Sequence, residues 1–309
     1  MKGQARILIS VIVPAWNYGH FLARAIDSVL AQLNAQSELI VINDGSTDDT
    51  PLILASYESK YLANFRVIHT ENKGAAAARN LGVTLARGSH LLMLDADDEL
   101  MSDAIDLLTD LVKQHLTVDV ALGGHLSCSE TGLCKYRAPG VVGRTPERRI
   151  VDYLLNNKLE MSHGCNLFRR ELLLDSPYPE ELRSQEDLPV FASLLLASHF
   201  VRVNKPIAKI YHHSKSLRHN AILTSSEADR VSYAVLDRLP QRFSSLVPQY
   251  RAKRRLSLFR LATKIGEDKK ARTLYWEAFY IAPKQALKWR YFRKALLMHV
   301  RLFKGRFSL

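Results

Sequence analysis

The chain has 309 residues, of which 47% are hydrophobic and 24% charged, a mixture typical of a globular protein. This composition excludes a wholly disordered chain and a fibrous repeat, and no run of about 18 apolar residues predicts a membrane-spanning helix. The net charge of +12 is uneven: residues 1–220 carry 23 Lys and Arg against 25 Asp and Glu, and residues 221–309 carry 20 against 6. The excess positive charge therefore belongs to the last third of the chain.

The first hundred residues alternate between predicted strands and predicted helices. Apolar and β-branched runs predict buried parallel strands at 7–13, 38–42, 65–69 and 90–94. Helical periodicity or helix start signals appear after each of the first three strands, at 21–30, from residue 46, and at 75–86. Strand–helix units at such short intervals predict an α/β fold with a parallel, doubly wound sheet.

A polar cluster follows each of these four strands. The clusters are Pro14–Tyr18, Asn43–Asp49, Glu71–Arg79 and Asp95–Asp98. Ligands of open α/β sheets bind outside the carboxyl ends of the strands. We therefore expect the four clusters to share one ligand-binding edge.

The remainder of the chain is mixed and then helical. Strands are expected near 118–126, 164–169 and 200–212, helices near 102–116, 148–158 and 187–198, and a mainly helical, Lys/Arg-rich pattern from about residue 221. The three cysteines, Cys128, Cys134 and Cys165, are odd in number and lack paired metal-ligand spacing. They predict a reducing, cytoplasmic location without structural disulfides.

Asp95 and Asp97 form an Asp-x-Asp pair at the end of a predicted strand. Two carboxylates at a chain reversal can reach one hard cation, and Mg²⁺ and Mn²⁺ prefer oxygen ligands that they share with substrate phosphates. The alternative is helix capping before the helix near Ser102. The pair alone does not decide between these roles.

Other polar residues at the same edge also have two alternative roles. Asp44 can accept hydrogen bonds from a base or ribose, or form an Asx-turn. Lys73 and Arg79 flank a helix start, which suits a diphosphate, or are surface charges.

Later in the chain, an acidic pair and a histidine are further candidates. Glu186 and Asp187 precede an apolar helix, where an acid can serve as a general base or as a cap. His213 can be a third metal ligand or a surface residue.

Taken together, these segments resemble the inverting family 2 glycosyltransferases of the GT-A fold. The matching blocks, in order, are SVIVPAWNYGHFLARAIDSVLAQ, ELIVINDGSTDDT, ENKGAAAARNLGVTLARG and HLLMLDADDEL. The similarity continues more loosely through CNLFRRELL, LRSQEDLPVFASL and HHSKSL, and covers residues 7–218. One departure is Ser176–Glu181 (SPYPEE), which stands where the family often has Gly-Gly-Phe-Asp-Glu.

The resemblance implies a nearly complete set of site residues. Pro14, Ala15, Trp16 and Asn17 match the first nucleotide-binding loop, and Asp44 matches the acid that contacts the base, usually uracil. Lys73 and Arg79 match the block that closes over the nucleotide. Asp95 and Asp97 match the motif that meets the ribose and binds Mn²⁺ or Mg²⁺, Asp187 matches the catalytic base, and His213 resembles a residue that approaches the metal.

The implied organisation is a GT-A catalytic domain over residues 1–220, with a nucleotide-binding half (1–100) and an acceptor half (101–220), followed by a basic helical region over 221–309. The implied activity is inverting transfer of a sugar from a nucleotide-diphosphate sugar, usually a UDP-sugar, to a hydroxyl of a glycan or lipid-linked acceptor in cell-surface polysaccharide synthesis. The alternative is a non-catalytic nucleotide-sugar-binding regulatory protein on the same fold.

The tail has its own pattern. Within residues 284–306, five apolar residues form one stripe at helical spacing: Trp289, Phe292, Leu296, Val300 and Phe303. Lys and Arg surround this stripe. A basic amphipathic helix of this kind can lie on an anionic membrane, here at the inner face, or the stripe can pack on the catalytic domain. No nucleic-acid partner is expected, because no recognisable RRM, KH or helix-turn-helix pattern accompanies the basic residues.

Overall fold

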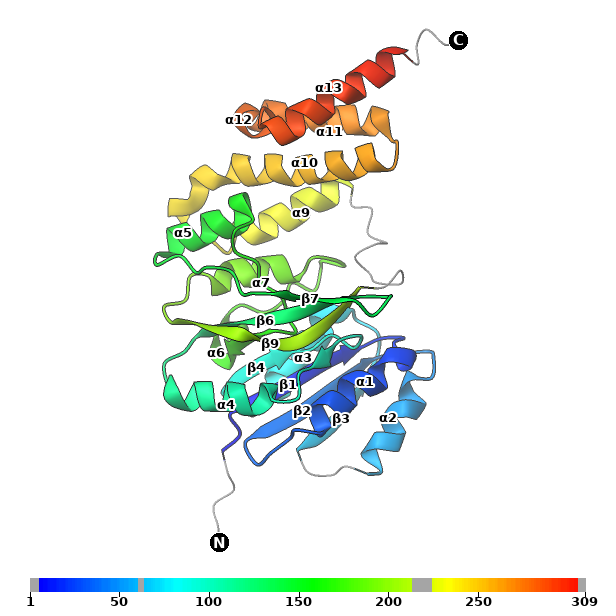
Figure 1. The fold of residues 1–309 in the computed structure, drawn as a ribbon, viewed down its shortest axis with the longest axis vertical. Coiled ribbons are helices and arrows are strands. Elements are labelled where there is room, and N and C mark those ends of the chain that lie inside the picture. The colour runs from blue at the N-terminus through cyan, green and yellow to red at the C-terminus, as the bar shows by residue number, and fades with distance from the viewer. Residues whose placement is uncertain (1–5, 61–63, 213–223, 305–309) are drawn as a thin grey trace.

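The computed structural model describes residues 6–60, 64–212 and 224–304, and the side chains beyond Val300 are outside the description. A curled, mixed sheet forms the centre of the molecule, with strand order β3-β2-β1-β4-β8-β6-β9-β5 and β7 paired to β6. Helices cover both faces of the sheet, and the C-terminal helices stack at one end (Figure 1). This is the predicted α/β fold.

The four predicted N-terminal strands are confirmed. They are β1 (Ile9–Ala15), β2 (Ser37–Asp44), β3 (Phe65–Thr70) and β4 (His90–Met93), and they pair in parallel. The second half of the sheet is mixed rather than parallel. It contains β5 (Glu99–Leu100), β6 (Val120–Ser129), β7 (Cys134–Arg137), β8 (Asn166–Arg169) and β9 (Phe200–His212).

Alternate residues of the buried strands belong to two different apolar cores. Ile12 of β1 and Ile40 of β2 point into a core with α3 (Ala75–Leu85), α6 (Arg170–Asp175) and α7 (Asp187–Leu194). Val11 and Leu39 point into the opposite core, with α1 (Gly19–Leu30), α2 (Thr50–Glu58) and α4 (Ala104–Gln114). Burial on both faces explains why these strands have continuous rather than alternating apolar sequences.

The core that contains α7 continues past residue 220. Besides α5 (Pro146–Val151) and the π-helix η1 (Asp152–Asn156), it includes buried residues of α9 (Ser225–Leu236), of the 3₁₀ helix η2 (Gln241–Leu246) and of the first turn of α10 (Val247–Lys264). A separate third core joins α10 to α11 (Asp268–Ile281), α12 (Pro283–Ala286) and α13 (Trp289–Lys304). The first part of the C-terminal helical region therefore packs as part of the same body as the central sheet.

The expectation of no structural disulfide is wrong, because Cys128 and Cys134 are disulfide-bonded. β6 and β7 form an antiparallel hairpin whose register puts these two residues directly opposite each other, with Cα atoms 4.1 Å apart. Cys165 is free and buried. The cysteine pattern thus gives no support to a cytoplasmic location.

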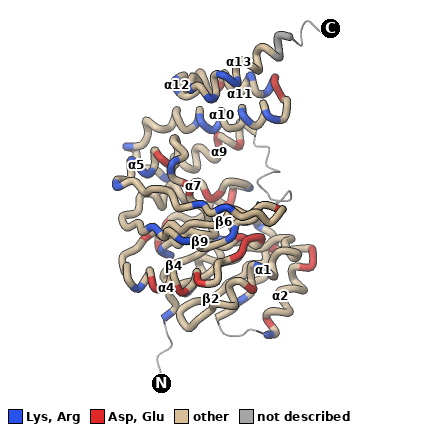
Figure 2. Tube along the Cα trace, in the orientation of Figure 1, with Lys and Arg blue, Asp and Glu red and all other residues tan. Residues whose placement is uncertain are grey.

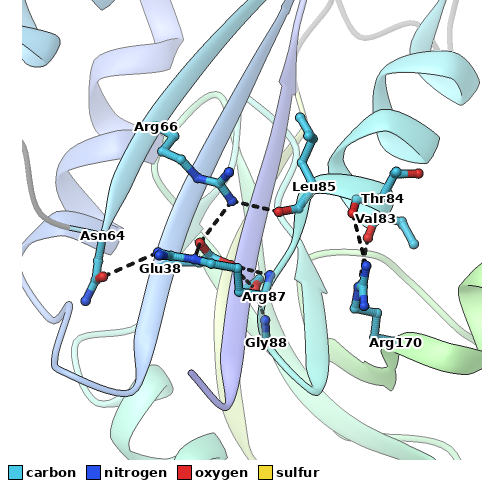
Figure 3. Close-up of polar contacts among 10 residues, drawn as sticks. Glu38, Asn64, Arg66, Val83, Thr84, Leu85, Arg87, Gly88 and Arg170 are labelled. Carbon is cyan, nitrogen blue, oxygen red and sulfur yellow. Dashed lines mark hydrogen bonds and ion pairs between the residues drawn. The ribbon is translucent and has the colours of Figure 1, made fainter. Parts of the chain in front are cut away.

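The amino-terminal edge of the sheet is held by a buried carboxylate, Glu38 of β2 (Figure 3). Its Oε1 accepts hydrogen bonds from the Ser10 hydroxyl (2.7 Å) and the Arg87 backbone N–H (2.6 Å). Its Oε2 accepts from the guanidinium groups of Arg87 (2.8 Å) and Arg66 (3.1 Å). Although burial alone would raise the pKa of Glu38, these hydrogen bonds hold it below its ordinary value. One side chain thus connects β1, β2, β3 and the end of α3.

We expect Glu38→Gln to lower the free energy of unfolding by about 1–3 kcal/mol, because it breaks charge-assisted hydrogen bonds at a buried position. Since the folded-state pKa of Glu38 is depressed, its contribution is present above about pH 4.3 and is lost as the pH falls through the folded-state pKa. Urea unfolding at neutral pH and at progressively lower pH measures both effects. The exposed Glu58 of α2 provides a matched control, Glu58→Gln, with an expected change within about 0.5 kcal/mol. An equal loss in both variants would contradict this assignment.

Candidate functional site

The loops after β1 and β2 are joined at the carboxyl-terminal edge of the sheet. The backbone N–H of Asn17 donates to the Ser46 hydroxyl (3.0 Å), and the Asn17 side-chain oxygen accepts from the Thr47 N–H (2.7 Å). Asn17 has a φ of +57°, a left-handed conformation that a short polar side chain tolerates. These contacts hold the loop Pro14–Asn17 in place, and Trp16 within it is 46% exposed.

Asp44, at the end of β2, connects this edge to the start of α3. Its two carboxylate oxygens accept hydrogen bonds from the backbone N–H groups of Lys73 and Gly74, both at 2.8 Å. The residue is 3% exposed, whereas the side chain of Lys73 is exposed. Asp44 therefore shapes the loop before α3, and the Lys73 ammonium group is at the surface of the same loop.

Arg79 of α3 is the buried centre of the site. One arm of its guanidinium is 3.0 Å from Asp95 Oδ1, and the other is 2.5 Å from Glu186 Oε1. The side chain is only 8% exposed. α3 lies close to β1 here, because Gly82 contacts Ile12 where an added Cβ would be 2.4 Å from a side-chain carbon. Arg79 thus joins the end of β4 to the start of α7 instead of standing open at the surface.

Asp187 begins α7, next to Glu186. Burial raises the pKa of its carboxyl to about 6; the negative charges of Glu186 and Asp95 add to the rise, and the Arg79 guanidinium opposes it. Gln185, two residues before Asp187, has a φ of +60°, which is rare for a side chain of this size. A carboxyl group with this pKa changes protonation state near neutral pH, which suits proton transfer.

Three tyrosines lie within electrostatic reach of Asp187: Tyr153 of η1, Tyr178 of the segment before α7, and Tyr250 of α10. Burial raises the pKa of each hydroxyl, and the Asp187 carboxylate adds to the rise. The Tyr178 hydroxyl is 3.0 Å from His163 Nε2, whereas the buried Tyr153 hydroxyl has no hydrogen-bond partner in the part of the chain that the structure describes.

The C-terminal helical region reaches the site through Arg254 of α10. Its guanidinium donates a hydrogen bond to the side-chain oxygen of Gln185. None of these tyrosines, nor Arg254, was identified from the sequence. Only Tyr178 had a signal, because it belongs to the SPYPEE segment that departs from the family pattern.

The acidic loop after β4, Asp95–Asp98, is held by contacts with Tyr211 and Arg24. The Asp98 carboxylate accepts from the Tyr211 N–H (3.0 Å), and the Arg24 guanidinium donates to the Asp97 carbonyl while lying 3.7 Å from the centre of the Tyr211 ring. Burial and the charges of Asp97, Asp95 and Asp98 raise the pKa of Tyr18 to about 12. Tyr18 therefore lies beside the same acidic loop.

A divalent cation fits the donor chemistry of this loop. Asp95 and Asp97 are partly exposed carboxylates, and Mg²⁺ is commonly bound by one or two carboxylates together with substrate phosphates. Among the described residues no group of three or more His, Cys, Asp or Glu side chains could hold a metal ion by itself. The predicted third ligand, His213, lies outside the described residues.

Comparison with known proteins finds relatives that are named as glycosyltransferases. The model of "Glycosyl transferase family 2" matches residues 10–175. Glycosyltransferase GlyG of Streptococcus pneumoniae is 28% identical over 207 residues, which are 64% of this chain and 68% of that protein. An uncharacterized glycosyltransferase, EpsJ of Bacillus subtilis, is 31% identical over 59% of this chain and 54% of its own. The alignment with EpsJ therefore spans only about half of that relative.

Solved structures share the fold over almost the whole chain. S. aureus TarS, solved with UDP-GlcNAc, has a TM-score of 0.61 at 20% identity, covering 97% of this chain and 92% of its own. The mannosyltransferase PcManGT of Pyrobaculum calidifontis, solved with GDP-Man and Mn²⁺, has a TM-score of 0.57 at 16% identity, covering 96% and 85%. With the family match over more than half of its length and the GT-A architecture of its sheet, the chain belongs to glycosyltransferase family 2.

Proposed function

We propose that this glycosyltransferase transfers a sugar from a UDP-sugar to a hydroxyl group of a glycan or lipid-linked acceptor, with inversion at the anomeric carbon. The observation that carries the proposal is the Asp187 carboxyl, whose pKa is raised to about 6 at the start of α7, beside Arg79 and the acidic loop. TarS binds UDP and UDP-GlcNAc on the same fold, which supports UDP as the nucleotide.

The donor site in this proposal is the edge formed by the first three clusters. Pro14, Ala15, Trp16 and Asn17 contact the nucleotide, and Asp44 contacts the base from a position fixed by the loop before α3. The exposed ammonium group of Lys73 is available to the diphosphate. Arg79 acts differently, by orienting Asp95 and Glu186 through its two ion pairs.

Asp187 is the proposed catalytic base, and its carboxylate takes the proton of the acceptor hydroxyl as that oxygen attacks the sugar. Attack on the face opposite the leaving diphosphate inverts the anomeric configuration. Asp97 and Asp95 would hold Mn²⁺ or Mg²⁺, with His213 a tentative further ligand, and the cation would offset negative charge on the leaving diphosphate.

The acceptor is proposed from the relatives, and the location from the resemblance to family 2. The minor teichoic acid biosynthesis protein GgaA of Bacillus subtilis is 29% identical over 61% of this chain and 43% of its own, which favours a cell-surface polymer. We place the reaction in the cytoplasm, at the inner face of the membrane. No helix in the described part of the chain is both long and apolar enough to cross a bilayer.

Asp187→Asn tests the base directly. We expect kcat to fall by about 10²–10⁴-fold, while the affinity for the UDP-sugar stays within about two-fold, because the amide keeps the shape but cannot take a proton. UDP release and donor titration measure the two quantities. Near-normal turnover would contradict the assignment. If the wild-type protein binds the UDP-sugar but does not turn it over, that result would instead support the regulatory alternative.

The pH dependence of kcat is a second test. A base must be deprotonated to act, so we expect the rate to fall about ten-fold per pH unit below about pH 6 and to level off above it, in line with the raised pKa of Asp187. A rate that stays constant down to pH 4 would contradict Asp187 as the base.

Asp97→Ala tests the cation. We expect this variant to lose the strengthening of UDP-sugar binding by Mn²⁺, because one of two carboxylate ligands is removed. Titration of the donor with and without Mn²⁺ measures the effect, and Asp106→Ala, an exposed acid on α4, is the control. Equal donor affinity in Asp97→Ala and the wild type at saturating Mn²⁺ would contradict the role.

Arg254→Ala tests the contribution of the C-terminal region. We expect a lower kcat and a shifted pH profile with little change in donor affinity, since Arg254 holds Gln185, two residues before the proposed base. Arg254→Lys, which retains a donor, should recover part of the activity. Arg251 of the same helix pairs with Asp229 instead, so Arg251→Ala is a matched control. A pH profile that stays unchanged in Arg254→Ala would contradict this positioning role.

A further inference from the structure

We propose that α13 and the cavity beside it form a binding site for anionic phospholipids at a membrane surface. The apolar part, here called the outer face, consists of Trp289, Phe292, Leu296 and Val300. The charged part is a cavity between α10 and α13. This inference does not depend on the sugar-transfer reaction, because neither part touches the candidate active-site residues.

α13 has two apolar faces, and only one of them packs on the protein. Tyr291, Ala295 and Met298 are buried in the third core, against α10 and α11. On the outer face, Trp289 is 71% exposed, Leu296 56%, Val300 45% and Phe292 40%. The alternative that this stripe packs on the catalytic domain is therefore wrong for these four side chains. Phe303 lies outside the described side chains.

The cavity between the two helices has a volume of about 230 Å³ and is rich in cations. Its lining residues are Arg260, Thr263, Lys264, Lys294 and Leu297. Among the residues that the structure describes, none of the three cationic side chains forms an ion pair. One water occupies about 30 Å³, so the space accommodates several waters or a phosphate group. Leu297, 56% exposed on α13, forms an apolar part of the same wall.

Residues 278–309 contain no Asp or Glu, and two of the nearby acids are already paired, Glu267 with Lys270 and Glu277 with Arg255. Glu277 is the last Asp or Glu of the sequence, and Lys and Arg occur throughout the rest. Figure 2 shows Lys and Arg positions along α10 and α13, whereas those of α11 are confined to its first five residues. An apolar face with aromatic anchors beside unpaired cations is typical of a helix that lies in the interface of an anionic membrane.

Two other partners fit the surface less well. A second copy of this chain, docked through the same face, would bring Lys- and Arg-rich surfaces together without acids to pair with them. A nucleic acid supplies phosphates but leaves the four outer-face side chains in water. A bilayer with anionic headgroups satisfies both parts at once: the cavity receives a phosphate and the outer face enters the acyl boundary.

Co-sedimentation with vesicles tests the proposal on the full chain. We expect binding to phosphatidylcholine vesicles that contain about one third phosphatidylglycerol, and little binding to phosphatidylcholine alone. Lys264→Ala combined with Lys294→Ala should weaken the partition at least ten-fold, at about five-fold for each cation removed near the surface. Trp289→Ser combined with Leu296→Ser should weaken it by a similar factor, because apolar area no longer enters the membrane.

Matched control variants lie at the other end of the molecule. Lys60→Ala combined with Lys113→Ala removes the same charge from α4 and the end of α2, and Leu116→Ser changes a side chain that is 77% exposed. These controls should bind vesicles as the wild type does, and all variants should keep the wild-type unfolding midpoint because they replace exposed or, for Lys294, partly exposed side chains.

Several results would overturn the proposal. One is equal binding to neutral and anionic vesicles, and another is an equal loss in the control variants. Full release of bound protein by inorganic phosphate at constant ionic strength would indicate a site for free phosphate instead. Dimerisation without vesicles that the outer-face variants abolish would identify a second copy as the partner.

Discussion

The candidate site depends on one buried cation, the Arg79 guanidinium, held between two carboxylates from different parts of the chain. Asp95 follows β4 and Glu186 precedes α7, so these two ion pairs join the first hundred residues to the part of the chain that carries the proposed base. If Arg79 were absent, three carboxylates would be neighbouring negative charges at a partly buried position: Asp95, Glu186 and Asp187. Such an arrangement is unfavourable. With Arg79, the site keeps Asp187 titratable near neutral pH, because burial and Glu186 raise its pKa and Arg79 opposes them.

The two ends of the parallel strands use charge differently. At the amino-terminal edge, Glu38 is fully satisfied by Ser10, Arg66 and Arg87, and its pKa is held low. At the carboxyl-terminal edge, Asp187 has a raised pKa, and the nearby Tyr153 hydroxyl is buried without a hydrogen-bond partner among the described residues. Satisfied polar groups stabilise a fold, whereas perturbed and unpaired ones at a ligand-binding edge are typical of functional sites.

Much of the first hundred residues was predictable because local pattern and global fold agree there. Strands buried on both faces have continuous apolar sequences, and each is followed by its polar cluster. The role of Arg79 was not predictable, since a basic residue near a helix start has the same sequence signal whether it faces a ligand or two distant carboxylates. Tyr250 and Arg254 were missed because their positions near Gln185 and Asp187 depend on how α10 packs, which helical periodicity does not report. The Cys128–Cys134 disulfide depends on hairpin register, and an odd cysteine count conceals it.

The most direct test of this account is a panel of nucleotide-sugars with Mn²⁺, scored by release of the nucleoside diphosphate. The account predicts that at least one UDP-sugar releases UDP measurably faster than GDP-sugars release GDP, with further acceleration by a suitable hydroxyl acceptor. Tight binding of UDP-sugars with no release of UDP, with or without acceptors, would contradict it.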